Sequence, residues 1–249
     1  MSIENKVLVL LGPTASGKTA LAVALAKQLD GEIVSADSRQ IYRGMDIGTG
    51  KDLQEYGSVP YHVIDNHEIG DAYSVAHFQK EAIDAIQDIR SRGKRVIVCG
   101  GTGLYLESLI QQYQFSRVPD FLEKPLEYAF EFQVFGLNPS LDVRRERISI
   151  RLKQRLEAGL VDEVKGLLGR GVSTDALAWM GLEYKWTLDY LGGHVTRERF
   201  EQGLEVAIQQ FAKRQMTFFR KMEKGGVGIQ WIPDSLDFQG KSNFVLKNL

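Results

Sequence analysis

The sequence predicts an α/β protein in which a doubly wound, mostly parallel sheet is followed by a largely helical C-terminal half. Two observations carry this prediction. Short apolar segments alternate with helical patterns up to residue 137, which is typical of parallel strands joined by crossover helices. After Pro139 the apolar periodicity is almost entirely helical.

The alternation begins with a strand at residues 7–11, where five consecutive apolar residues indicate burial on both faces of a parallel sheet. Residues 18–29 are predicted to follow as a helix, because leucines recur there at every fourth position. The next apolar segment, residues 32–35, predicts a second strand. Together these three segments form a strand, helix, strand unit.

A further helix is predicted at residues 74–92, where apolar side chains recur at helical spacing. It leads into a strand at residues 95–99. The glycine-rich turn at residues 100–103 then opens an apolar helix from Leu104, and residues 132–137 predict a later strand. The pattern therefore repeats the order expected of a doubly wound core.

Amphipathic helices are predicted in the C-terminal half at residues 141–158, 160–170, 174–191 and 196–222. A short strand is predicted at residues 229–232. We expect the helical part, residues 140–225, to pack on the sheet within one catalytic domain that spans residues 1–249. The least regular stretch lies at residues 107–131.

Composition excludes several classes of protein. The chain has 249 residues, 31 Lys and Arg, 32 Asp and Glu, and 43% hydrophobic residues, which argues against disorder, collagen or a coiled coil. Cys99 is the single cysteine, and the first residues lack the apolar region of a signal peptide, so we expect a cytoplasmic protein. No apolar segment is long enough to cross a membrane. The near-zero net charge predicts that any RNA is bound by a local basic surface.

A phosphate-binding loop is the strongest motif. The segment fits the pattern G-x-x-x-x-G-K-[ST] between a predicted strand and a predicted helix, and comprises Gly12, Pro13, Thr14, Ala15, Ser16, Gly17, Lys18 and Thr19. Backbone N–H groups can surround a phosphate, Lys18 can neutralise it, and the Thr19 hydroxyl can bind magnesium. This context predicts a P-loop NTPase-like fold that binds a di- or triphosphate. The alternative is a glycine-rich turn without a ligand.

The loop after the second predicted strand carries a candidate catalytic carboxylate. In a doubly wound sheet, Asp37 lies at the same edge as the phosphate loop. Asp37 could accept a proton from a nucleophile, or bind magnesium through water. The alternative is an Asx turn or helix cap made by Asp37 and Ser38.

Several further motifs follow the phosphate loop. The chain contains DSRQIY at residues 37–42, DIGTGK at 46–51, YHVID at 61–65, YSVA at 73–76, GGTGLY at 100–105, GLVDEV at 159–164, MGLEYK at 180–185 and AKRQMTFFR at 212–220. In order and spacing these motifs resemble the tRNA dimethylallyltransferase family, also called tRNA isopentenyltransferases. Most of the chain is covered by this resemblance.

The resemblance implies transfer of a dimethylallyl group from its diphosphate to the exocyclic amine of an adenosine beside a tRNA anticodon. In that case the phosphate loop holds the diphosphate as leaving group, with Mg²⁺ as cofactor. Asp37 becomes the general base. Residues expected to seat the adenine or its backbone are Ser38, Arg39 and Gln40, while Thr102 is expected to reach the same centre. Close packing of a turn is the alternative for residues 100–103.

Four arginines can form one basic stripe on the helix predicted at residues 141–158: Arg144, Arg147, Arg151 and Arg155. The resemblance implies that Arg147 or Arg151 approaches the diphosphate, and Arg151 is favoured because the residues after it continue the family pattern. The alternative is a solvated face with ion pairs to Asp142 or Glu146. A second basic group comprises Lys213, Arg214, Arg220 and Lys221.

Histidines near residues 61–67 lack the spacing of metal ligands, and His62 is interpreted as a loop or core residue.

The sequence departs from the family at two places. Longer members carry a helical insertion that contacts tRNA, and only residues 107–131 stand in its place, which makes this segment a remnant of the insertion. Gly50 and Asp52 flank Lys51 where relatives tend to have alanine and proline.

Two other functions stay open at this point. Adenylate isopentenyltransferases are also short, and they modify a free adenine nucleotide (AMP, ADP or ATP) instead of the anticodon stem-loop of tRNA. A P-loop kinase or an ATP-binding module is the alternative from another class. We expect a monomer without a membrane partner in each case.

Overall fold

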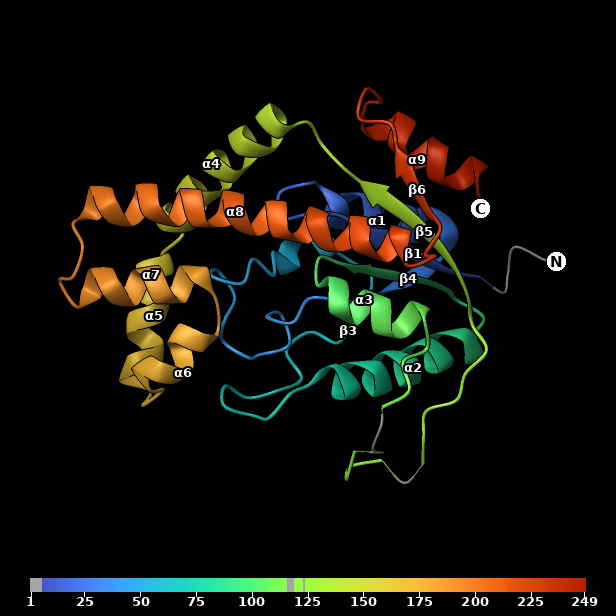
Figure 1. Cartoon of the computed structure of the whole chain (residues 1–249), viewed down its shortest axis with the longest axis horizontal. Coiled ribbons are helices and arrows are strands. Elements are labelled where there is room, and N and C mark those ends of the chain that lie inside the picture. The colour runs from blue at the N-terminus through green and yellow to red at the C-terminus, as the bar shows by residue number, and fades with distance from the viewer. Residues whose placement is uncertain (1–5, 116–118, 123) are drawn as a thin grey trace.

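The computed structural model describes residues 6–115, 119–122 and 124–249. Within these residues six strands form one sheet in the order β3-β2-β4-β1-β5-β6, and each neighbouring pair is parallel. The strands are β1 (Lys6–Leu11), β2 (Gly31–Ser35), β3 (Tyr61–His62), β4 (Arg95–Gly100), β5 (Glu131–Leu137) and β6 (Ile229–Ile232). The predicted doubly wound parallel sheet is confirmed (Figure 1).

Strand β1 lies inside the sheet and is buried on both faces, as its apolar run predicts. Val7, Val9 and Leu11 belong to the core cluster that includes side chains of α2 (Val75–Ser91), α3 (Gly103–Ile110) and the C-terminal half of α8 (Arg197–Lys224). Leu8 and Leu10 belong to the opposite cluster, with α1 (Lys18–Leu29) and α9 (Phe238–Lys247). Alternate side chains of one strand therefore join two cores.

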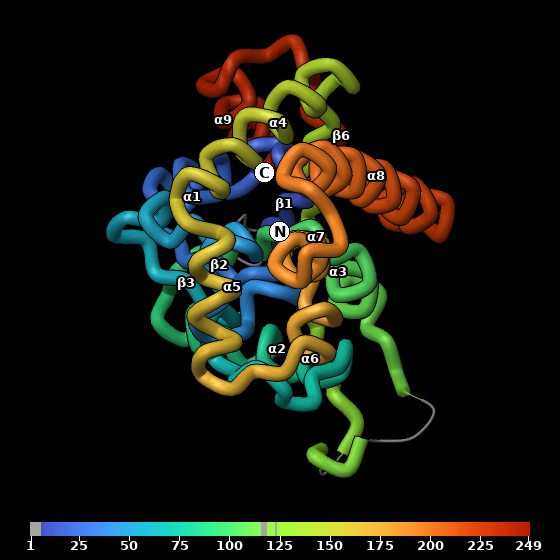
Figure 2. Tube along the Cα trace, turned by 90° about the vertical axis from the view of Figure 1, so that its left-hand side faces the viewer, coloured from blue at the N-terminus to red at the C-terminus, as the bar shows by residue number. Residues whose placement is uncertain are grey.

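The C-terminal half is helical, as predicted, but one expected helix is two. The helices are α4 (Leu141–Glu157), α5 (Leu160–Gly169), α6 (Thr174–Trp179), α7 (Leu182–Leu191) and α8. The single helix predicted at residues 174–191 is wrong, because Gly181 has φ 153° and ψ 175°, a conformation that essentially only glycine adopts. Figures 1 and 2 show α5, α6 and α7 at one end of the molecule, with α8 reaching back over the sheet. Among the described residues no helix has the length and apolar character needed to span a membrane.

Three short elements were not predicted: β3, the 3-10 helix η2 (Leu53–Tyr56) and α9. Strand β3 has two residues, too few for a periodic pattern. Helix α9 contains glycine, serine and asparagine, so its intrinsic preference is weak. The Asp237 side chain caps it by accepting a hydrogen bond from the N–H of Gly240 at 2.7 Å, and buried Val245 anchors it to the core.

Both arms of the connection from α3 to β5 are hydrogen-bonded to one buried side-chain amide. Nε2 of Gln79, on α2, donates to the carbonyl oxygens of Ser108 and Tyr113 at 3.1 and 3.2 Å, and lies 3.2 Å from the hydroxyl of Tyr128. Gln79 is fully buried. Both arms of this connection are thereby attached to the same side chain.

A buried carboxylate ties β2 to β3 and to the end of α2. The side chain of Glu32 is 5% exposed, accepts a hydrogen bond at 2.9 Å from Nη2 of Arg92, and lies 2.7 Å from Nε2 of His62. The hydrogen bond from Arg92 holds the pKa of Glu32 at about 2, and the contact with His62 adds to this lowering. Because the pKa is lower in the folded than in the unfolded chain, ionised Glu32 stabilises the fold.

We expect Glu32→Gln to lower the free energy of unfolding at pH 7 by about 2 kcal/mol. The difference from the unmodified protein should shrink as pH falls from about 5 towards 2, because the unfolded-state carboxyl then gains its proton first. Denaturant unfolding between pH 7 and 3 measures this, with exposed Glu146→Gln as control. An equal difference at pH 7 and pH 3 would contradict the assignment.

Candidate active site

The phosphate loop connects the end of β1 to the start of α1 in a tight turn. The N–H of Ser16 donates to the carbonyl oxygen of Pro13 at 3.3 Å, and positive φ angles occur at Ala15 (60°) and Gly17 (84°). A Cβ added to Gly12 would lie 2.7 Å from the Ser16 hydroxyl. A side chain at position 12 would therefore collide with the Ser16 hydroxyl and crowd the carbonyl oxygen of Leu137.

Lys18 is the first residue of α1, and its ammonium lies 3.5 Å from the carbonyl oxygen of Pro13. Burial lowers the pKa of Lys18, and the negative charge of Asp37 partly offsets this lowering. The two predicted catalytic groups are thus electrostatic neighbours. A further neighbour of Lys18 is Cys99 at the end of β4, whose own pKa is raised by burial to about 12.

A cleft of about 960 Å³ opens beside the phosphate loop. Its lining comes from the phosphate loop, η2, α4 and the segment around the start of α9, and includes Lys18, Thr19, Asp52, Arg147, Arg151, Arg155, Asp237 and Lys241. Among the described residues, the lining does not include Asp37, Ser38, Arg39, Gln40 or Thr102. The cleft and the Asp37 loop are therefore separate parts of the site.

Three of the four stripe arginines of α4 line this cleft, and Arg144 does not. Arg147 donates to the carbonyl oxygen of Ser16 at 3.3 Å, which places its guanidinium against the phosphate loop. Arg151 donates to the carbonyl oxygen of Gly50 at 3.3 Å and forms an ion pair with Asp52. Arg155 pairs with Glu183 of α7 at 3.0 Å. Of the two arginines expected near the diphosphate, Arg147 thus contacts the phosphate loop directly, whereas Arg151 contacts the loop at residues 50–52.

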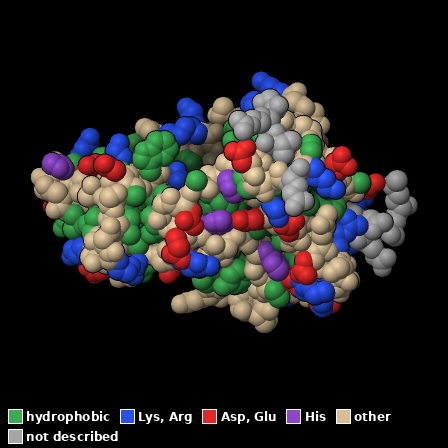
Figure 3. Space-filling model, turned by 90° about the horizontal axis from the view of Figure 1, so that it is seen from below, with side chains coloured by type: hydrophobic (Ala, Val, Ile, Leu, Met, Phe, Trp, Pro, Cys, Tyr) green, Lys and Arg blue, Asp and Glu red, His purple; other side chains and the backbone are tan. Residues whose placement is uncertain are grey.

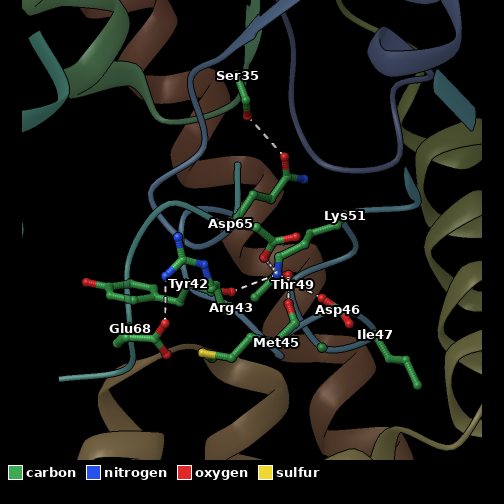
Figure 4. Close-up of polar contacts among 12 residues, drawn as sticks. Ser35, Tyr42, Arg43, Met45, Asp46, Ile47, Thr49, Lys51, Asp65 and Glu68 are labelled. Atoms are coloured by element: carbon green, nitrogen blue, oxygen red, sulfur yellow. Dashed lines mark hydrogen bonds and ion pairs between the residues drawn. The ribbon is translucent and has the colours of Figure 1, made fainter. Parts of the chain in front are cut away.

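That loop is shaped by a buried lysine (Figure 4). The side chain of Lys51 is fully buried, and its ammonium donates to the carbonyl oxygen of Tyr42 at 2.7 Å and to the carboxylate of Asp46 at 2.8 Å. It also forms an ion pair with Asp65, which follows β3. A buried charge needs such partners, so residues 42, 46 and 65 are held around one point.

A carboxylate of the helical half binds the same loop. Glu163, on α5, accepts hydrogen bonds from the backbone N–H groups of Asp46, Ile47 and Gly48 at 2.8, 2.7 and 3.0 Å. It also accepts one from the hydroxyl of Tyr184, on α7, at 2.7 Å. A Cβ added to Gly48 would lie 2.5 Å from the Tyr184 ring. The sequence did not single out Glu163, because its backbone partners lie more than a hundred residues away.

The Asp37 loop is held by several side-chain hydrogen bonds. Oδ1 of Asp37 accepts a hydrogen bond from the N–H of Arg39 at 3.0 Å, which is the Asx turn foreseen as the alternative and leaves Oδ2 outside this contact. Thr102, at the start of α3, accepts a hydrogen bond from the N–H of Ser38 at 3.0 Å. Gln40 contacts the hydroxyl of Ser35 at 3.1 Å and donates to Gly50. Thr102 and Gln40 therefore position this loop.

His62 and His67 each lie beside acidic side chains. His62 lies in β3 rather than in a loop, beside Glu32. Nε2 of His67 lies 2.6 Å from Glu81, and its other ring nitrogen lies 3.6 Å from Asp71. Figure 3 shows histidine and acidic side chains side by side near the centre of the face seen from below.

With this geometry established, comparison with known proteins assigns the family. The family model described as IPP transferase matches residues 40–129 and 117–222. The chain belongs to the IPP transferase family.

Two curated relatives match almost end to end. The tRNA dimethylallyltransferase 2 of Bacteroides fragilis is 41% identical over 301 positions, which cover 99% of this chain and 98% of the relative. The tRNA dimethylallyltransferase 2 of Syntrophotalea carbinolica is 44% identical over 282 positions, covering 92% and 95%. The solved tRNA isopentenylpyrophosphate transferase of Bacillus halodurans superposes with a TM-score of 0.85 at 32% identity, covering 98% of this chain and 96% of that one.

We expect Glu163→Ala to lower the free energy of unfolding by about 2 kcal/mol, because three backbone N–H groups and the Tyr184 hydroxyl lose their acceptor. Denaturant unfolding at pH 7 measures the change. Neighbouring Asp162→Ala is the matched control, since the Asp162 side chain is 79% exposed and pairs at the surface with Lys165. Equal effects of both variants would refute the proposed contribution of Glu163.

Proposed function

We propose that this protein transfers a dimethylallyl group from dimethylallyl diphosphate to the exocyclic amine of the adenosine adjacent to the tRNA anticodon. The observation that carries the proposal is the end-to-end match to tRNA dimethylallyltransferases, combined with a cleft at the phosphate loop that Lys18 and Arg147 line, beside a carboxylate. The protein is a prenyltransferase. A tRNA acceptor agrees with the cytoplasmic location that the sequence predicts.

The cleft supplies the groups that a diphosphate leaving group needs. Lys18 and Arg147 lie at the phosphate loop, and the free N–H groups at the start of α1 add partial positive charge. A bound diphosphate raises the pKa of Lys18 again and keeps it charged. These cations stabilise the negative charge that develops as the carbon–oxygen bond breaks.

The phosphate loop also contains oxygen donors that fit Mg²⁺. The Thr19 hydroxyl lines the cleft, and the buried Ser16 hydroxyl has no hydrogen-bond partner among the described residues. Mg²⁺ binds few protein ligands and completes its coordination with phosphate and water oxygens. When bound, it would supply further charge stabilisation to the diphosphate. Thr19 is the residue that would hold it, with Ser16 beside it.

Asp37 serves as the general base. The adenine amine attacks the allylic carbon, a carbon–nitrogen bond forms, the diphosphate leaves with the carbon–oxygen electron pair, and the Asp37 carboxylate accepts the amine proton. The Asx turn occupies Oδ1 and orients the carboxylate so that Oδ2 can accept this proton. Because Asp37 does not line the cleft, the reacting carbon must lie between Asp37 and the diphosphate.

The proposed tRNA acceptor has one specific alternative, a smaller acceptor molecule. An alignment of 301 positions with a chain of 249 residues leaves at least 52 positions of the Bacteroides fragilis relative opposite gaps. The two matches to the family model meet at residues 117–129, which supports a loss of the tRNA-contacting insertion within residues 107–131. A smaller acceptor, such as free AMP, ADP or ATP, is the second candidate for this reason.

The remaining chain still offers basic surface for tRNA. Exposed cations lie along the C-terminal half of α8, namely Lys213, Arg214, Arg220 and Lys221. Arg214 lies over the Phe211 ring, and Lys221 lies over the Phe218 ring. Basic and aromatic side chains of this kind bind the phosphates and bases of single-stranded loops. We propose that a monomer is sufficient to bind the anticodon stem-loop.

The test of the proposed function is label transfer from radioactive dimethylallyl diphosphate, with magnesium, to unmodified bulk tRNA and in parallel to AMP, ADP and ATP. We expect label in tRNA. Label only in a nucleotide would identify an adenylate isopentenyltransferase. Label in neither, together with tight ATP binding, would support a kinase or nucleotide-binding module.

We expect Asp37→Asn to abolish transfer while binding of dimethylallyl diphosphate persists, because the asparagine amide keeps the size of the side chain but cannot accept the proton. Single-turnover transfer and equilibrium binding of the diphosphate measure the two effects. Transfer by the variant at the rate of the unmodified protein would refute the role of Asp37 as base.

A further inference from the structure

Gln215 connects two loops of the site through one buried amide. Its side chain projects from α8, and the residue is 8% exposed. Oε1 accepts a hydrogen bond from the N–H of Thr14, in the phosphate loop, at 2.8 Å. Nε2 donates to the carbonyl oxygen of Gly101, in the loop after β4, at 2.9 Å. Residues 14 and 101 belong to neighbouring strand ends and share this bridge.

The contacts require an amide in one orientation. Its oxygen must face a donor and its nitrogen an acceptor, which leucine cannot reproduce and an ionised carboxylate reproduces at one end only. The space is also fitted to this side chain, since a Cβ added to Gly101 would lie 2.5 Å from Nε2. A side chain at position 101 would therefore collide with the Gln215 amide.

The bridge continues to the Asp37 loop. Thr102, next to Gly101, donates its N–H to the carbonyl oxygen of Ala36 at 3.1 Å. Its hydroxyl accepts the N–H of Ser38 at 3.0 Å. Both neighbours of Asp37 are thus attached to Thr102. A continuous series of hydrogen bonds runs from the phosphate loop through Gln215 and Thr102 to the two residues that flank Asp37.

We propose that Gln215 is a positioning residue for prenyl transfer, which sets the distance between the bound diphosphate and the Asp37 carboxylate. It would not contact the reacting atoms, because both ends of its amide are occupied by backbone groups. The inference depends on the proposed function, since the distance matters only when a leaving group and a base act on one carbon. Small displacements of reacting groups reduce rates strongly.

The test compares Gln215→Leu and Gln215→Glu with the unmodified protein, using dimethylallyl diphosphate and whichever acceptor the unmodified protein labels. For Gln215→Leu we expect kcat to fall by about 10- to 100-fold. The Kd of dimethylallyl diphosphate should change by less than about threefold, because Lys18, Thr19 and Arg147 are intact. Gln202→Leu, an exposed position on the same helix, is the matched control and should keep kcat unchanged.

The pH profile of Gln215→Glu separates positioning from a general loss of structure. A protonated carboxyl accepts from Thr14 and donates to Gly101 as the amide does, and burial raises the pKa of this new carboxyl. We therefore expect the kcat of Gln215→Glu, relative to the unmodified protein at the same pH, to recover between about pH 8 and pH 5.5. Gln215→Leu should show no such recovery.

Three results would overturn the inference: an unchanged kcat in Gln215→Leu, equal losses in Kd and kcat, or a flat pH ratio for Gln215→Glu. If Gln215→Leu does not fold, the pH ratio of Gln215→Glu decides alone. If the unmodified protein is active and any of these three results is obtained, only the positioning role of Gln215 is refuted. Absence of transfer by the unmodified protein to every acceptor refutes the proposed function as well.

Discussion

The buried ammonium group of Lys51 determines the shape of the loop on which both halves of the molecule meet. Its charge lies away from solvent and is stable there only because Tyr42, Asp46 and Asp65 surround it. The loop so formed presents backbone N–H groups to Glu163 of the helical half. It also presents the carbonyl oxygen of Gly50 to Gln40 and Arg151. These polar contacts thus add to the apolar core that the helical half shares with the sheet.

Much of the fold could be predicted because its signals are local. The apolar run of β1 predicts burial on both faces, and the spacing of leucines predicts α1. The break between α6 and α7 could not be predicted from periodicity, since it depends on the backbone conformation of Gly181. Strand β3 and helix α9 exist through tertiary packing and capping, which outweigh their weak local preferences.

The residues of the site likewise divide into those with a local sequence signal and those without one. The phosphate loop and Asp37 could be found because each is a short motif at a predicted strand end. Gln215 is hydrogen-bonded to Thr14, 201 positions away, and Glu163 is hydrogen-bonded to Ile47, 116 positions away. No local sequence pattern therefore predicts these partners. One signal for Gln215 was present: it is a polar residue on the apolar face of α8, between buried Ala212 and Phe219. A polar group on such a face requires a buried partner.

Gly50 and Asp52, where the sequence is predicted to depart from the family, both lie against the arginines of α4. Arg155 occupies the volume that a Cβ at Gly50 would fill, and Asp52 supplies a carboxylate to Arg151.

The attachment of both arms of the α3–β5 connection to Gln79 has an evolutionary consequence. Since the ends are already held together, the free-energy cost of a longer segment grows only with the logarithm of its length. A whole module can therefore be gained or lost there while the chemistry is inherited unchanged, so acceptor choice and catalysis can evolve separately.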